Sequence, residues 1–320
     1  MPDDVAAAPK AHEKYERLIA SARQLDGVAM AVAHPCDAVS LESAVEAAKL
    51  GLIRPVLVGP VARIRAAADA ARLDIGPFEI VDAEHSHDSA AKAVQVVRAG
   101  RAEALMKGSL HTDELMGAVV SRSEGIRTAR RISHCFIMDV PGHPTALVIT
   151  DAAVNIAPDL EAKVDIVQNA IDLVHAMGVA EVRVAILSAM ETVNPKVPST
   201  IEAAALCKMA DRGQITGAVL DGPLALDNAI SVDAAAIKQI VSPVAGQANV
   251  RVVPDLEAGN MLAKSLSFLA HADAAGIVLG ARVPIVLTSR ADSLLTRLAS
   301  CAVAVLVAAS RRASVNAAIV

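Results

Sequence analysis

The chain has 320 residues, of which 54% are apolar and 20% charged, a balance that can bury a large core and argues against disorder. Its net charge is −5 and no long run of like charges occurs, so nucleic-acid binding is not expected, because neutralising phosphates requires clustered lysine and arginine. Aromatic residues make up only 1%, which leaves few side chains on which single-stranded bases could stack.

The start of the chain, its apolar runs and its cysteines predict a cytoplasmic protein that does not enter a membrane. Asp3 and Asp4 stand where a signal peptide carries positive charge, and no apolar stretch follows them. The longest apolar run, CAVAVLVAA at 301–309, is about half as long as a membrane-spanning helix. The four cysteines are far apart and form no CxxC pair, as expected for small buried side chains in a reducing compartment.

Short β-rich runs alternate with alanine-rich helical stretches along the chain. Helical stretches such as 41–51, 160–178 and 199–213 each end at a glycine, which suits a helix C-terminus. Strand–helix alternation with nearly continuous apolar strands predicts an α/β fold, in which helices cover both faces of a mostly parallel sheet. The predicted strands, in chain order, are 28–34, 55–59, 78–82, 104–108, 146–151, 182–188, 217–222, 250–255, 276–280 and 284–289.

Polar residues and glycines follow six of these strands. In open α/β sheets, ligands bind beyond the carboxyl ends of the strands, so we expect the six exits to converge on one rim of a sheet or on a cleft between two sheets. Any single exit is equally well explained as an ordinary turn. The exits are Lys107-Gly108-Ser109, Thr150-Asp151 with Asn155, Glu191 with Asn194, Asp221-Gly222-Pro223, Asp255 with Asn260, and Ser289-Arg290 with Asp292.

The stretch LTSRADS at 287–293 contains an arginine that a simple strand-to-helix turn does not explain. Ser289 and Asp292 have the spacing of a capping box, with aspartate in place of glutamate. Arg290 would then lie in the first helical turn, where a cation opposes the helix dipole at a cost of about 0.3–1 kcal/mol. An anion bound there would reverse the sign of that interaction, so the sequence predicts a phosphate-like ligand at this position.

Other motifs are weaker. The loop Lys107-Gly108-Ser109 lacks the spacing of a P-loop, and no GxGxxG follows a strand, so nucleotide-binding fingerprints are absent. The HSH sequence at 85–87 is interpreted as a solvated pair, because no cysteine or carboxylate cluster completes a metal site. His111 and His134 are interpreted as hydrogen-bonded scaffold.

Several long motifs together resemble the phosphate acetyltransferase/phosphate butyryltransferase family, from about residue 25 to the C-terminus. The motifs look closer to the butyryltransferase-like branch than to the main acetyltransferase branch. They include KGSLHTDELM, RISHCFIMD, LVITDAAVNIAPDLEAKVDIVQNA, DGPLALDNAIS, VVPDLEAGNMLAKSL and PIVLTSRADS.

The resemblance implies two α/β/α domains with mostly parallel sheets that face each other across a cleft, in a fold like that of isocitrate and isopropylmalate dehydrogenases. The first domain would comprise residues 1–143 plus 273–320, and the second residues 144–272. The implied reaction converts an acyl-CoA (acetyl, propionyl or butyryl) and orthophosphate into an acyl phosphate and CoA. A homodimer is implied, with CoA as a substrate and with no metal or redox cofactor.

Residue by residue, the resemblance places Ser289 and Arg290 in the active cleft. The thiol proton would go to a carboxylate, for which Asp292 and Asp221 are the candidates. The predicted phosphate- and CoA-binding residues are Lys107, Gly108, Ser109, Arg130, Asn155, Gly222, Pro223 and Asn260.

Two positions depart from the family pattern. Thr296 stands where acetyltransferases carry a proposed aspartate base, and Met116 lies near the place of a family arginine, for which Lys107, Arg127 or Arg130 would have to substitute. These departures keep open a degenerate family member that binds CoA or an anion without turnover. A metal- and NAD-dependent hydroxy-acid dehydrogenase, with metal carboxylates from Asp221, Asp227 and Asp255, is a weaker alternative.

Overall fold

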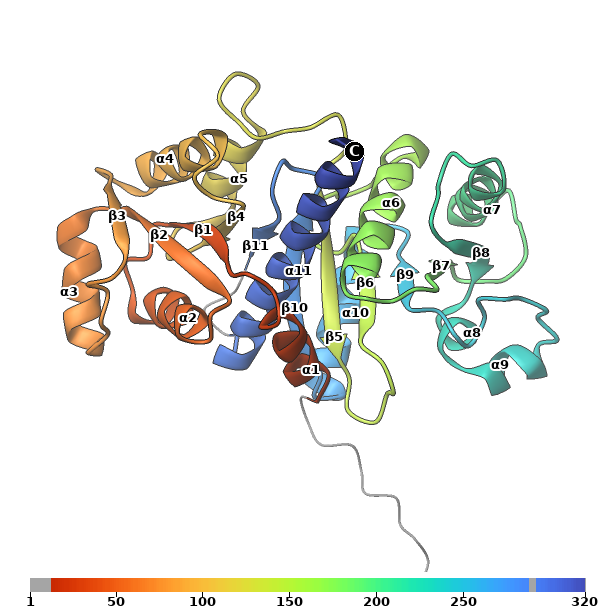
Figure 1. Cartoon of the computed structure of the whole chain (residues 1–320). Coiled ribbons are helices and arrows are strands. Elements are labelled where there is room, and N and C mark those ends of the chain that lie inside the picture. The colour runs from red at the N-terminus through yellow and green to blue at the C-terminus, as the bar shows by residue number, and fades with distance from the viewer. Residues whose placement is uncertain (1–12, 288–291, 320) are drawn as a thin grey trace, which may run out of the picture.

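Every run predicted as a strand forms one in the computed structural model, which describes residues 13–287 and 292–319 (Figure 1). One further strand, β5 (Ser133–Asp139), is absent from the prediction, because serine, histidine and aspartate interrupt its apolar run; all three side chains are buried. The other strands are β1 (Val28–Ala33), β2 (Ile53–Gly59), β3 (Glu79–Asp82), β4 (Ala104–Lys107), β6 (Leu147–Thr150), β7 (Arg183–Leu187), β8 (Val219–Leu224), β9 (Val250–Val252), β10 (Asp273–Leu279) and β11 (Ile285–Val286).

The strands form one eleven-stranded sheet in the order β3-β2-β1-β4-β11-β10-β5-β6-β9-β7-β8. Both flanks of the sheet are parallel, whereas the central pairs β11–β10, β10–β5 and β5–β6 are antiparallel. Three antiparallel steps reverse the strand direction between the flanks. The carboxyl ends of β1, β4 and β11 therefore lie at one long edge of the sheet, and those of β6, β7, β8 and β9 lie at the opposite edge.

The two expected sheets are joined into one, because β5 pairs with β6 across the predicted boundary at residue 143. That boundary falls in the connection between these strands, and residue 272 immediately precedes β10. Strands of the segment 144–272 form one flank of the sheet, and the remaining strands form the other flank and part of the centre. The division into two domains stays a prediction.

The helices lie between the strands as the sequence predicts. Gly51, Gly178 and Gly213 follow the ends of three helices with positive φ angles of 75°, 88° and 75°, as expected of C-terminal glycines. The helices are α1 (Glu13–Ala22), α2 (Ala38–Lys49), α3 (Val61–Ala71), α4 (Ser86–Arg98), α5 (Thr112–Val120), α6 (Leu160–Ala176), α7 (Pro198–Asp211), α8 (Leu226–Ile230), α9 (Val232–Ile237), α10 (Leu256–Leu269) and α11 (Leu294–Ile319).

The apolar core is continuous on one face of the sheet and split on the other. One cluster joins α1, α2, α3, α6, α7 and α11 on the first face, where α11 crosses the middle of the sheet (Figure 1). On the second face, α4 and α5 cover one cluster, and α8, α9 and α10 cover another. The layers of helices on the second face thus belong to opposite flanks of the sheet.

Helix α11 is long and apolar enough to cross a membrane by length and composition, the one such helix among the residues described. Within its most apolar stretch, Leu294–Ser314, 72% is buried in the fold. This is the burial expected of a core helix, whose apolar surface is covered by neighbouring elements.

Candidate active site

The loop Lys107-Gly108-Ser109 leaves the sheet beside the segment LTSRADS. β4 and β11 are parallel neighbours, with Met106 paired to Val286, so Lys107 and Leu287 emerge side by side at the same edge. Ser289 and Arg290 themselves lie outside the residues described. The sheet therefore brings together two of the predicted strand exits, although 180 residues separate Lys107 from Leu287 in the sequence.

Backbone hydrogen bonds tie this loop to the carboxyl end of β1. The N–H of Gly108 donates to the carbonyl of Ala33 at 2.8 Å, and the N–H of Ser109 donates to the carbonyl of His34 at 2.9 Å. Ser109 Oγ donates to the same His34 carbonyl at 2.8 Å and accepts from the N–H of Cys36 at 3.1 Å. A Cβ on Gly108 would lie 2.5 Å from the Ala33 carbonyl oxygen, so only glycine fits here.

Helix α11 begins at Leu294, later in the chain than a capping box at Ser289 would require. Ser293 Oγ accepts from the N–H of Thr296 at 3.1 Å, as an N-cap side chain does. Of the predicted capping box, Ser289 lies outside the residues described, and Asp292 lies two residues before the start of the helix. Arg290 also lies outside the residues described, so the prediction of an anion beside it at the helix terminus stays a prediction.

Thr296, at the family's aspartate position, is buried in a chain of hydrogen bonds beneath the start of α11. Its hydroxyl accepts from Ser293 Oγ at 3.0 Å and donates to the carboxylate of Asp273 at 3.2 Å. Asp292 also lies near the start of α11, where its backbone carbonyl accepts a hydrogen bond from Arg297 Nη1 at 2.7 Å. Two carboxylates, Asp273 and Asp292, thus lie near the start of α11.

Asn155, Asn260 and Arg130 lie toward the opposite edge, around the carboxyl end of β6. Asn155 Nδ2 donates to the Ile132 carbonyl at 2.9 Å and to Asp151 Oδ2 at 2.5 Å. Asn260 Nδ2 donates to the Ala152 carbonyl at 3.3 Å, and Arg130 forms an ion pair with Asp172 on α6. These three predicted binding residues are all engaged in contacts within the chain.

Asp221, Gly222 and Pro223 lie within β8 rather than after it. The Gly222 N–H donates to Asp221 Oδ1 at 2.8 Å, and a Cβ on Gly222 would lie 2.7 Å from the Ile186 carbonyl oxygen. β8 ends the sheet six strands from β11, which corresponds to about 29 Å at about 4.8 Å per strand. The exits of the two flanks therefore do not share one rim of the sheet, because the antiparallel centre separates them; the alternative expectation, a cleft between two domains, stays a prediction.

A cluster of histidines and Glu114 lies beside the 107–109 loop and was not predicted as part of the site. Glu114 accepts from Ser86 Oγ at 2.6 Å and from the His111 N–H at 2.8 Å, and it pairs with His87 Nδ1 at 3.0 Å. The hydrogen bond from Ser86 is the main reason why the pKa of Glu114 is lowered. His34 ends β1 in a left-handed conformation, and burial lowers its pKa. Its place as the last residue of the predicted strand 28–34 was the available signal.

The histidines singled out in the sequence have structural contacts. His85 caps α4 by accepting from the Asp88 N–H at 3.2 Å, so the HSH sequence belongs to a helix start. His134 packs edge-to-face on Phe136 with ring centroids 4.4 Å apart, and burial lowers its pKa to about 4. Its Nδ1 has no hydrogen-bond partner, which corrects the expectation of a fully hydrogen-bonded scaffold histidine. Over residues 13–287 and 292–319, no metal-binding group of His, Cys, Asp or Glu occurs.

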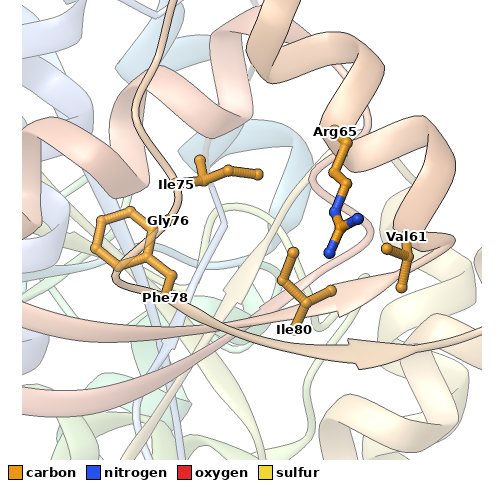
Figure 2. Close-up of a pocket in the computed structure, with 6 residues that line it drawn as sticks. All are labelled: Val61, Arg65, Ile75, Gly76, Phe78 and Ile80. Atoms are coloured by element: carbon orange, nitrogen blue, oxygen red, sulfur yellow. The ribbon is translucent and has the colours of Figure 1, made fainter.

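A hollow of about 300 Å³ opens between α3 and β3, far from the predicted site residues (Figure 2). Figure 2 shows the guanidinium of Arg65 above Ile80, among apolar side chains. β3 lies four strands from β11, or about 19 Å at about 4.8 Å per strand. None of the predicted site residues lines this hollow; the lining residues are Val61, Arg65, Ile75, Gly76, Phe78 and Ile80.

Comparison with known proteins places the chain in the family that the motifs resemble. The model of the Phosphate acetyl/butaryl transferase family matches residues 83–305, and the chain belongs to this family. A phosphate acetyltransferase of Rhizobium meliloti is 68% identical over 311 residues, covering 97% of this chain and 98% of that protein. A phosphate butyryltransferase of Clostridium acetobutylicum is 40% identical over 289 residues, covering 90% and 95%. The higher identity to an acetyltransferase runs against the expected closeness to the butyryltransferase branch.

Solved structures agree with this placement. A branched-chain phosphotransacylase from Enterococcus faecalis V583 superimposes with a TM-score of 0.77 at 29% identity, covering 88% of this chain and 99% of that chain. A 4-hydroxythreonine-4-phosphate dehydrogenase from Klebsiella pneumoniae shares the fold more distantly, with a TM-score of 0.52 at 13% identity over 88% of this chain and 99% of that chain. The second likeness concerns the fold alone, which is the dehydrogenase-like α/β fold expected from the sequence.

Proposed function

We propose that this chain transfers a short acyl group reversibly between coenzyme A and orthophosphate, giving an acyl phosphate and CoA. The observation that carries the proposal is the 68% identity, over nearly the full length of both chains, to a phosphate acetyltransferase. The acyl group moves between sulfur and oxygen without a change of oxidation state, so the reaction itself requires no redox cofactor. We also propose a cytoplasmic location.

Phosphate would be held at the shared exit of β4 and β11. Phosphate is a modest nucleophile that must be desolvated and aimed, so positioning supplies much of the catalysis. We assign Arg290 to a bidentate contact with phosphate oxygens and Ser289 to a hydrogen bond with phosphate or with the thioester carbonyl. Support comes from the adjacent 107–109 loop, whose glycine is required by its close approach to Ala33 and whose lysine lies at the same edge.

Asp292 is the better of the two candidate bases. In the direction that forms acyl-CoA, the sulfur–carbon bond forms, the bond from carbon to the phosphate oxygen breaks, and the thiol proton goes to a carboxylate. Asp292 lies six residues after β11, near the start of α11, whereas Asp221 lies in β8, six strands from β11 in the sheet. Proton transfer requires hydrogen-bond reach, so we propose Asp292 and not the Asp221 of the same chain.

The other predicted binding residues form two groups. Lys107, Gly108 and Ser109 border the proposed phosphate position. Arg130, Asn155, Gly222, Pro223 and Asn260 stay proposed CoA contacts. Among them, Arg130 and Asn155 would have to exchange contacts with Asp172 and Asp151 for contacts with CoA.

The first measurement is phosphate-dependent loss of thioester with acetyl-CoA, propionyl-CoA and butyryl-CoA in parallel. We expect turnover that requires phosphate, with acetyl-CoA preferred because the 68% identical relative is an acetyltransferase. One methylene is worth about 1–3 kcal/mol in a fitted pocket, so the preference should be roughly 10- to 200-fold per methylene. CoA binding without turnover of any thioester would instead identify a degenerate, ligand-binding family member.

We also propose that the protein is a homodimer. The apolar side chains that are most exposed in the part of the chain described belong to the 144–272 segment, among them Ile237, Val241, Phe268 and Leu269, with exposures of 80% or more. Large apolar side chains exposed to this extent are candidates for an interaction surface. Light scattering should give twice the mass of 32.9 kDa, and Phe268→Asp should shift the equilibrium toward monomer. A wild-type monomer at all concentrations would contradict the proposal.

A further inference from the structure

Arg251 is buried in the middle of β9, with only 1% of its surface exposed. Its neighbours in the sheet are Ile149 on β6 and Ala185 on β7. Val250 and Val252 point to the face of the continuous core, so Arg251 points to the other face, which α8, α9 and α10 cover. The surrounding cluster is built from alanine, leucine, isoleucine, valine and methionine side chains.

Arg251 differs from every other buried charged side chain in the described part of the chain. Lys14 pairs with Asp139 at 2.6 Å, and Lys163 pairs with Glu202. The remaining two also have partners: Asp151 accepts four N–H bonds and Arg297 pairs with Glu42. The Nε and Nη1 of Arg251, in contrast, have no hydrogen-bond partner. A buried charge without a partner is strongly unfavourable, so the isolated chain leaves this guanidinium uncompensated.

Burial, with no neighbouring acid among the residues described, governs the charge of Arg251. Burial lowers the pKa of Arg251 to about 10, so the guanidinium remains charged at neutral pH. No acidic side chain in the described part of the chain acts to raise this pKa again. His143, in the connection between β5 and β6, has a pKa lowered first by burial and then by the charges of Arg251 and Lys14. An anion held at Arg251 would compensate its buried charge.

We propose that Arg251 binds a small oxyanion, a phosphate or a carboxylate, on the face of β9 that α8, α9 and α10 cover. The planar guanidinium fork matches the oxygens of either group and would regain the hydrogen bonds that Nε and Nη1 lack. β9 lies four strands from β11, or about 19 Å at about 4.8 Å per strand, so this site is distinct from the proposed phosphate position of the reaction. The inference does not depend on the proposed function.

The test is thermal unfolding of the full chain in inorganic phosphate, and separately in acetate, against chloride at the same ionic strength. Arg290→Ala serves as the parent, so that binding at the proposed catalytic position is removed. In chloride, Arg251→Met on this parent should unfold at the same or a higher temperature, because methionine fills apolar space without a charge. In phosphate or acetate, the Tm of the parent should rise and that of the Arg251→Met protein should not. The parent should then unfold at the higher temperature of the two.

Two further variants make the result decisive. Arg251→Lys keeps the charge and loses the fork, so it should lose most of the anion-dependent shift even if Arg251→Met folds poorly. Arg183→Met, on neighbouring β7 and paired with Glu181, should keep the full shift. Equal shifts in the parent and in Arg251→Met would overturn the proposal. So would the absence of any shift together with loss of self-association in Arg251→Met, because the partner would then be a carboxylate of a second copy.

Discussion

Replacing Arg290 with alanine is expected to lower kcat/KM for phosphate by roughly 100- to 1,000-fold, the loss typical of removing one positioned donor at a developing charge. Lysine keeps the charge but loses the planar fork. Arg290→Lys should therefore lose one charge-assisted hydrogen bond of about 1.5–3 kcal/mol, or roughly 10- to 100-fold. Initial rates at varied phosphate, with acetyl-CoA saturating, would separate the effect on phosphate KM from that on kcat.

The matched control is Arg65, which lines the hollow between α3 and β3 (Figure 2) and lies beside the edge strand β3, four strands from β11. Arg65→Ala removes the same positive charge and should leave phosphate kinetics unchanged. Equal losses in both variants would mean that net charge, rather than the fork of Arg290, governs phosphate use. Unchanged kinetics in Arg290→Ala would remove Arg290 from the site.

The strands were predictable because continuous apolar runs bounded by glycine and polar residues are typical of buried parallel strands. β5 was not, because its sequence SHCFIMD buries three polar side chains, two of which have partners from distant segments. Asp139 pairs with Lys14 on α1, and Ser133 Oγ accepts from Asn169 Nδ2 at 2.8 Å. Such long-range compensation leaves no trace in local periodicity.

The missed strand also explains why the predicted strand exits do not share one edge of the sheet. β5 and β10 form the antiparallel centre, and their insertion sends the exits of the two flanks to opposite edges. From the sequence alone, nothing indicated that Lys107 would emerge beside Leu287 while Asp221 would lie at the far end of the sheet. The motifs identified the family correctly, but the sequence could not show which of the motif segments meet within one chain.

The second large effect is expected on stability, at Asp151. This buried carboxylate accepts from the N–H groups of Ala153 at 3.0 Å and Val154 at 3.1 Å through Oδ1. Its Oδ2 accepts from the Asn155 N–H at 3.0 Å and from Asn155 Nδ2 at 2.5 Å. Asp151→Ala leaves these donors buried without an acceptor, so the free energy of unfolding should fall by about 3–5 kcal/mol, measured by urea denaturation.

Asp74→Ala is the control, because the Asp74 carboxylate is exposed and accepts from the Gly76 N–H, so its loss should change stability by about 0.5 kcal/mol or less. A comparably small change in Asp151→Ala would contradict the expected network.

Measurements of stability and of the KM for CoA in Asn155→Ala decide the role of Asn155. If Asn155 only holds the loop, Asn155→Ala should destabilise the chain, be strongly non-additive with Asp151→Ala, and leave the KM for CoA unchanged. If Asn155 contacts CoA, that KM should rise even where the protein remains fully folded.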